Sequence, residues 1–237
     1  SVAIVTKQEI LDAIHGKMII SCQAIPGEPL YLEDDSVMYL MARAAKRAGT
    51  PAIRTSSIRD VIAIKEETGL PVIGLVKIQY LGYEGYITPT MKEVDDLVAA
   101  GSDVVALDCT LRKRGDGSTV NEFIAQIKEK YPDIILMADI SNYEEGINAW
   151  KCGVDIVGTT MSGYTDYTSK KDEPDYELME RLAKDTDIPV IGEGKIHYPD
   201  QAVKALQTGV WAIVVGGAIT RPLEIAQRFQ KAIENSK

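Results

Sequence analysis

The sequence predicts a (β/α)8 TIM barrel with a short N-terminal helix, built as a single domain over residues 1–237. Short apolar runs alternate with helical patterns at a spacing of roughly 25–30 residues, which requires a parallel sheet. Eight such repeats favour closure of the sheet over an open, doubly wound one. The last two apolar runs end in glycines, as the final strands of a barrel do when their loops hold a phosphate.

Each element is expected from its residue pattern. The predicted strands are β-branched or aliphatic runs at 18–23, 52–54, 71–77, 104–108, 134–139 and 154–158, with the last two inside 189–195 and 211–220. The predicted helices have apolar residues at helical spacing and cover 7–15, 36–48, 58–68, 91–100, 120–130, 143–151, 175–184, 199–207 and 222–234. Gly49 and Gly69 are typical helix-ending residues, and Thr90 with Glu93 forms a capping-box pattern. The helix at 7–15 could close the bottom of the barrel.

Bulk composition limits the class of protein. Hydrophobic residues make up 45% and charged residues 26%, which is ordinary for a soluble globular domain. The net charge of −9 argues against nonspecific nucleic-acid binding. The sequence has no apolar run of about 18 residues, the length that a membrane span requires. The three cysteines lack CxxC spacing, so we expect reduced thiols in a cytoplasmic protein. From the net charge and the absence of a long apolar run, we expect no nucleic-acid or membrane partner.

Polar residues end five of the predicted strands. Gln23, Arg54, Lys77, Asp139 and Glu193 each follow an apolar run. A single polar residue there usually starts a solvated loop. Five on separate strands instead predict a site at the C-terminal mouth, where barrel enzymes place their chemistry.

These side chains suggest acid–base chemistry. A partly desolvated Lys77 beside Arg54 should have a depressed pKa and could act as a base, the alternative being an ion pair with Asp139 or Glu193. Glu193 could have a raised pKa and transfer a proton. Arg54 and Asp139 are interpreted as electrostatic partners that also hold substrate hydroxyls. Gln23 would hydrogen-bond a neutral amide or carbonyl group.

A phosphate site is expected beside these residues. Gly194, Gly216 and Gly217 should offer backbone N–H donors, and Lys195 or Arg221 should add positive charge. The alternative is that the glycines only form tight turns.

Two loops stay open to interpretation. The cationic segment 112–114 is either a solvated loop or a substrate-facing arm, and the polar loop 159–174 is long enough for a lid or a clamp. His15 and His197 are not predicted to lie near one another. We therefore expect neither a metal site nor a cofactor.

Several motifs together resemble a known family. They are Ser21–Ala24, Ala52–Arg54, the strand ending in Lys77, Tyr86–Thr90, Ala138–Ser141, Ser162–Thr165, Glu193–Ile196 and Gly216–Pro222. In register over nearly the whole chain, they look like the N-acetylmannosamine-6-phosphate 2-epimerases of bacterial sialic-acid breakdown.

The resemblance implies interconversion of N-acetylmannosamine 6-phosphate and N-acetylglucosamine 6-phosphate without metal or nucleotide. It implies that Lys77 is the base and Glu193 its glutamate partner. Supporting roles fall to Arg54, Asp139 and Gln23, and Arg221 lies on the phosphate side. Two positions depart from the family pattern: Lys195 stands where arginine is common, and Gly115 where proline is usual. Lysine cannot form the bidentate fork of arginine, so the detailed loop contacts are expected to differ.

Other functions are compatible with parts of the pattern. Another phosphate-binding barrel could act on a sugar phosphate, although a ribulose-phosphate epimerase would need histidine and aspartate metal ligands that this chain does not supply. A non-catalytic phosphosugar-binding barrel is the non-enzyme alternative. The final helix carries more apolar residues than one face requires, so a homodimer through this helix is expected: Leu223, Ile225, Ala226, Phe229 and Ile233.

Overall fold

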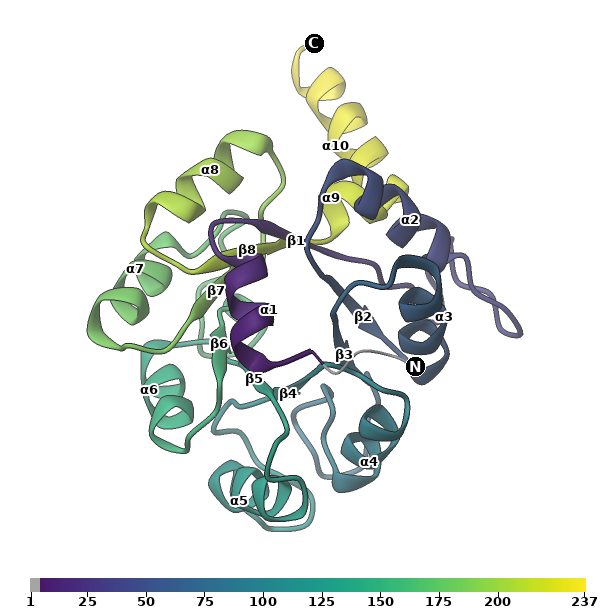
Figure 1. Cartoon of the computed structure of the whole chain (residues 1–237). Helices are drawn as coiled ribbons and strands as arrows, with labels where there is room; N and C mark the ends of the chain where they lie inside the picture. Colours follow the sequence, from purple (N-terminus) through teal and green to yellow (C-terminus); the bar gives the residue numbers. More distant parts are fainter. Residues whose placement is uncertain (1–4) are drawn as a thin grey trace.

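The computed structural model describes residues 5–237 and contains a closed barrel of eight parallel strands (Figure 1). Consecutive strands are neighbours, and the ring closes where β1 pairs with β8 through Ile19 and Val214. The strands are β1 Met18–Ser21, β2 Ile53–Ser56, β3 Val72–Leu75, β4 Val104–Asp108, β5 Leu136–Asp139, β6 Ile156–Gly158, β7 Val190–Glu193 and β8 Ala212–Val215. The predicted barrel is confirmed. Its assignment as one domain over 1–237 stays a prediction, since residues 1–4 lie outside the described part.

Helices surround the barrel and follow the predicted ranges closely. They are α1 Lys7–Ile14, α2 Met38–Ala48, α3 Ile58–Thr68, α4 Met91–Ala99, α5 Val120–Lys130, α6 Tyr143–Lys151, α7 Tyr176–Asp185, α8 Pro199–Gln207, α9 Gly217–Thr220 and α10 Pro222–Asn235. The capping box before α4 is formed, with the Thr90 backbone N–H donating to Glu93 Oε1 at 2.9 Å. Gly49 and Gly69 both adopt the left-handed conformation and end α2 and α3. These local signals set most helix boundaries.

The structure differs from the prediction at strand ends and near the C-terminus. Gln23 and Lys77 lie two residues beyond β1 and β3, and Arg54 is the second residue of β2 rather than its end. The short helix α9 was not expected as a separate element. Pro222 has no backbone N–H to continue α9, and it starts α10 at a favoured position.

The core has two layers because strand residues alternate between the faces of the sheet. In β4, Val104 and Ala106 point into the barrel, whereas Val105 and Leu107 pack against the helices. Helix α1 crosses the bottom of the barrel (Figure 1) and buries Ile10, Leu11 and Ile14 there. The predicted closure of this end is therefore confirmed.

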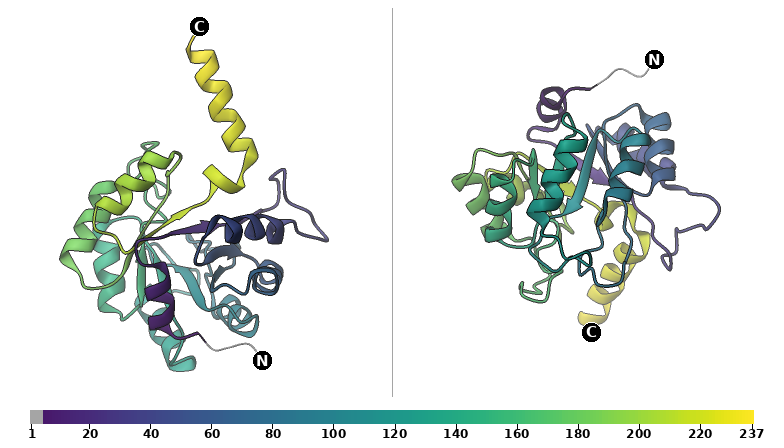
Figure 2. Two further views of the ribbon diagram at one scale, coloured as in Figure 1. Left: turned by 45° about the horizontal axis from the view of Figure 1, so that its top comes forward. Right: turned by 90° about the horizontal axis from the view of Figure 1, so that it is seen from below.

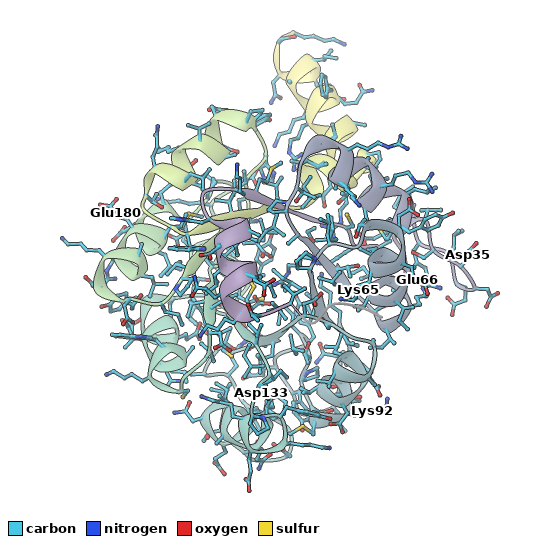
Figure 3. The ribbon with its side chains drawn as sticks, viewed as in Figure 1. Asp35, Lys65, Glu66, Lys92, Asp133 and Glu180 are labelled. Atoms are coloured by element: carbon cyan, nitrogen blue, oxygen red, sulfur yellow. The ribbon has the colours of Figure 1, made fainter. Side chains whose placement is uncertain are left out.

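Charged side chains lie around the molecule, and α10 carries several of its exposed apolar residues. The labelled side chains Asp35, Lys65, Glu66, Lys92, Asp133 and Glu180 lie on outer helices and loops (Figure 3). Helix α10 projects away from the barrel (Figure 2) and buries none of its residues. Over residues 5–237, no helix combines the length and apolarity that a membrane span requires.

Candidate active site

A pocket of about 310 Å³ opens at the C-terminal mouth of the barrel. Its walls contain most of the predicted site residues: Gln23, Arg54, Lys77, Glu193, Gly194, Lys195, Gly216, Gly217 and Arg221. Asp139 lies beneath them, fully buried. The structure thus brings all ten predicted residues to one site.

Strand alternation explains why the five strand-end side chains converge. Ile19, Leu75 and Met137 belong to the interior layer. Side chains two residues further along a strand point to the same side, so Ser21 and then Gln23, Lys77 and Asp139 continue into the barrel. The same parity places Arg54 after Ala52 and Glu193 after Ile191. A shift of one residue in any strand would turn its polar residue toward the helices.

A buried ion pair forms the floor of the site. Arg54 Nη1 donates to Asp139 Oδ1 at 3.1 Å, and Arg54 Nη2 donates to Asp139 Oδ2 at 2.7 Å. Glu193 Oε2 is 3.6 Å from Arg54 Nε. Burial disfavours the Arg54 cation, but these two carboxylates outweigh it and hold the pKa of Arg54 above its ordinary value. Arg54 is therefore a permanent positive charge below the pocket.

The segment after β3 fixes the position of Lys77. The chain folds back so that Lys77 pairs with Ile87, with hydrogen bonds from Ile78 N to Tyr86 O and from Thr88 N to Val76 O. Burial, and then the positive charges of Arg54 and Arg221, lower the pKa of Lys77 to about 8. In the described part of the chain, Lys77 makes no ion pair within 4.0 Å. The alternative of a direct pair with Asp139 or Glu193 is not the arrangement observed.

Glu193 is the last residue of β7 and supplies a carboxyl group to the pocket that also contains the Lys77 amine. Thr159 clamps its backbone: Glu193 N donates to Thr159 Oγ1 at 3.0 Å, and this hydroxyl donates to Glu193 O at 2.9 Å. Burial and the nearby Asp139 raise the pKa of Glu193 to about 7, although Arg54 and Lys77 act in the opposite direction. A base and an acid with pKa values this close can both exchange protons near neutral pH.

Gln23 presents an acceptor to this region. Its Nε2 donates to Ser21 Oγ at 2.8 Å, while its Oε1 is buried without a hydrogen-bond partner among the described residues. An unpaired buried carbonyl oxygen is costly unless another group supplies a donor. An amide N–H or a hydroxyl of a ligand would fit this requirement.

The other end of the pocket has the features expected for an anion. Gly194 and Lys195 both have positive φ, 102° and 63°, and the helix α9 starts at Gly217. Lys195 Nζ lies 4.6 Å from the ring centroid of Tyr164. Arg221 Nε is 2.9 Å from Glu28 Oε2, so the predicted phosphate-side arginine already has a carboxylate partner. Backbone donors and cations are thus gathered at this end.

Several pocket residues were not identified from the sequence. Thr160 Oγ1 donates to Asp139 Oδ1 at 2.8 Å and lines the pocket with Tyr86, His197 and Glu224. Thr160 lies two residues beyond the end of β6, as Gln23 and Lys77 do beyond theirs, so its place after a strand was an available signal. The other three come from loops or from α10, and their positions depend on how those segments fold back.

The cationic loop 112–114 does not reach this pocket. Arg112 Nη2 pairs with Asp108 Oδ2 at 2.7 Å. Arg114 Nη2 donates to Pro89 O, and its guanidinium lies 4.0 Å from the Phe123 ring centroid. The substrate-facing alternative is therefore wrong for these two arginines, which are held by partners outside the pocket walls.

The fold and this site define a (β/α)8-barrel enzyme whose pocket holds a lysine and a glutamate as an ionisable pair. Residues 38–235 match the model of a family described as "Putative N-acetylmannosamine-6-phosphate epimerase". The chain belongs to this family. The predicted resemblance is confirmed.

Individual relatives agree over almost the whole length. A protein of Caldanaerobacter subterraneus subsp. tengcongensis is 50% identical over 98% of this chain and 97% of its own, and one of Clostridioides difficile is 49% identical over 95% and 99%. Both are named "Putative N-acetylmannosamine-6-phosphate 2-epimerase". A solved N-acetylmannosamine-6-phosphate 2-epimerase from Clostridium perfringens superposes with a TM-score of 0.90 at 45% identity, covering 98% of this chain and 100% of that one.

Proposed function

We propose that this protein is an isomerase that interconverts N-acetyl-D-mannosamine 6-phosphate and N-acetyl-D-glucosamine 6-phosphate. Family membership supports the substrate and the reaction. The observation that carries the chemistry is the pair of ionisable groups in one pocket, Lys77 with a pKa of about 8 and Glu193 with a pKa of about 7. Epimerisation at the acetamido-bearing carbon needs this equipment, because a weakly acidic proton must leave and return.

The proposed steps follow from where the charges lie. Neutral Lys77 takes the proton from the acetamido-bearing carbon, and Glu193 exchanges a proton at a sugar oxygen or at the opposite face of that carbon. The Arg54 guanidinium stabilises the negative charge that develops, since it is prepositioned by Asp139. Gln23 Oε1 accepts from the substrate's amide N–H or a hydroxyl.

The phosphate group is proposed to bind at the glycine end of the pocket. Support comes from the backbone of Gly194 and Lys195, the turn at Gly216 and Gly217, and the charge of Arg221. This arrangement would place the reacting carbon toward Lys77 and Glu193.

Proton exchange tests the mechanism. Incubated with enzyme in deuterated water, N-acetylmannosamine 6-phosphate should gain deuterium at the acetamido-bearing carbon and form its epimer, as followed by NMR. Lys77→Ala should abolish both, whereas the control Lys65→Ala, which removes an ion pair with Asp103 away from the pocket, should retain both. Near-normal turnover by the Lys77 variant would remove the base assignment, and wild-type turnover without deuterium uptake would remove the proton-transfer mechanism.

We also infer a homodimer that uses α10. This helix has no buried residue, and its apolar side chains Leu223, Phe229 and Ile233 are exposed, Phe229 by 69%. A continuous apolar face on a projecting helix favours burial against a second copy. Light scattering should give the mass of a dimer for the wild type and of a monomer for Phe229→Glu; an unchanged mass would contradict the role of α10.

A cytoplasmic location is proposed with the same reaction. The three cysteines are unpaired thiols, the state that a reducing compartment maintains. Cell fractionation with the protein in the periplasmic or secreted fraction would contradict this location.

A further inference from the structure

A carboxylate lies against the turn where the phosphate is expected. Glu224, in the first turn of α10, lines the pocket together with Gly216 and Gly217. A Cβ atom added at Gly217 would lie 2.0 Å from Glu224 Oε2, so this oxygen packs against the glycine itself. Glycine at 217 therefore leaves the space that the Glu224 carboxylate occupies.

The cations around Glu224 only partly neutralise it. Arg228 Nη2 is 3.8 Å and Arg221 Nη1 is 4.0 Å from its carboxylate oxygens, both beyond hydrogen-bond distance. Arg221 is closer to Glu28, at 2.9 Å. With its side chain 43% exposed, Glu224 retains freedom to move when another anion arrives.

Arg228 connects this carboxylate to the loop over the pocket. Its Nη2 lies 2.6 Å from His197 Nδ1, and because arginine only donates, Nδ1 must accept. His197 Nε2 then carries the proton and donates to Asp172 Oδ1 at 2.9 Å. Arg228 Nη2 thus lies within 4.0 Å of both His197 and Glu224.

A phosphate group bound at the Gly216–Gly217 turn would lie close to the Glu224 carboxylate. A phosphate monoester carries about −1.5 to −2 charges near neutral pH, and like charges a few ångströms apart repel. We propose that the Glu224 carboxylate weakens binding of the phosphate end of the ligand, and that the positive charge of Arg228, 3.8 Å away, partly offsets this effect. A weaker anchor speeds release of the product, a step that often limits turnover. This inference rests on the proposed position of the phosphate.

Binding of inorganic phosphate tests the proposal without requiring turnover. By isothermal titration calorimetry, Glu224→Gln should bind phosphate roughly threefold to tenfold more tightly than the wild type, and the difference should shrink as salt rises. Glu224→Asp keeps the charge but withdraws it, and should tighten binding less. KM for the amino-sugar phosphate should also fall, more in Glu224→Gln than in Glu224→Asp.

The pairing with Arg228 gives an independent arm. Arg228→Gln should weaken phosphate binding, and adding Glu224→Gln to it should recover most of the loss, since the uncompensated carboxylate is then gone. The control Glu67→Gln removes an exposed partner of Arg43 outside the pocket and should leave the Kd unchanged.

The outcomes separate this proposal from the proposed function. A Kd for Glu224→Gln equal to or higher than that of the wild type would contradict the proposed repulsion between Glu224 and phosphate. It would instead indicate that Glu224 positions Arg221 and Arg228. If neither protein binds phosphate, the phosphate position and the role of Glu224 fail together. Tighter binding by Glu224→Gln in an enzyme that does not epimerise amino-sugar phosphates would support Glu224 and contradict the reaction.

Discussion

Arg54 and Asp139 form a bidentate pair at the floor of the pocket, with side chains 1% and 0% exposed and donor–acceptor distances of 3.1 and 2.7 Å. The two residues come from β2 and β5, across the barrel from one another. Their pairing therefore depends on closure of the sheet. Arg54 Nε also lies 3.6 Å from Glu193 Oε2, so the Arg54–Asp139 pair contacts one member of the proposed acid–base pair.

Asp139→Asn should destabilise the protein and impair catalysis together. Removing one partner of a buried ion pair leaves an uncompensated charge, at a cost of about 3–5 kcal/mol in the free energy of unfolding. Urea denaturation measures this loss, and kcat/KM should fall by roughly a hundredfold or more, because the Arg54 guanidinium is no longer fixed. Arg43→Lys, in an exposed pair with Glu67, is the matched control and should change stability by less than about 1 kcal/mol. A stable, active Asp139→Asn protein would contradict the role of this pair.

The pH dependence of kcat/KM should be bell-shaped. The proposed mechanism requires a protonated Glu193 and a neutral Lys77. Burial raises the pKa of Glu193 to about 7 and lowers the pKa of Lys77 to about 8. The doubly protonated form dominates below about pH 7 and the doubly deprotonated form above about pH 8, so activity falls on both sides. Glu193→Gln should lose the alkaline decline from its residual activity, because only the deprotonation of Lys77 then controls the rate. An alkaline decline that persists in Glu193→Gln would contradict the acid role.

The sequence contained enough to predict the barrel and the five interior polar residues. Apolar runs of β-branched residues and glycine-ended helices are local signals, and the two-residue period carries Lys77 and Glu193 to the same interior without any tertiary information. Residues such as His197 and Glu224 could not be placed in this way. Their contacts with Arg228, Asp172 and Gly217 join segments whose relative positions depend on loop and helix packing.

The same limit applies to the cationic loop. Three basic residues in a row at 112–114 are equally consistent with a substrate arm and with local ion pairing. Asp108, four residues before Arg112, and the Phe123 ring near Arg114 decide the outcome. Nothing in the local pattern shows that these partners are oriented toward the arginines.

Lys77→Met should stabilise the protein while it abolishes turnover. Burial lowers the pKa of Lys77 to about 8, so the unfolded chain binds a proton more tightly than the folded protein does. The cost of the buried ammonium is fully present below about pH 8 and disappears above the unfolded value, so stability should rise with pH in this window. At pH 7 the variant should gain about 1–3 kcal/mol in the free energy of unfolding by denaturant titration. A gain that persists unchanged above about pH 10.5 would show that packing rather than charge is the cause.

The loop 159–174 should depend on one carboxylate at its base. Glu145, on α6 and 2% exposed, accepts hydrogen bonds from Leu111 N at 3.1 Å, from Ser141 N at 2.8 Å and from the Tyr167 hydroxyl. It therefore ties together the segments that follow β4, β5 and β6. Thr160 and Tyr164, in the last of these, line the pocket.

Tyr167→Phe removes the single hydroxyl that fastens this loop to Glu145. The loop should open more often, because its middle then loses the contact with α6, whereas Thr160 and Ser162 hold only its start and Asp172 only its end. We expect KM for the amino-sugar phosphate to rise roughly threefold to tenfold, with faster proteolysis inside 159–174. Tyr143→Phe, which loses an exposed hydrogen bond to Asp185, is the matched control. Equal KM and equal proteolysis in the two variants would show that Tyr167 does not secure the loop.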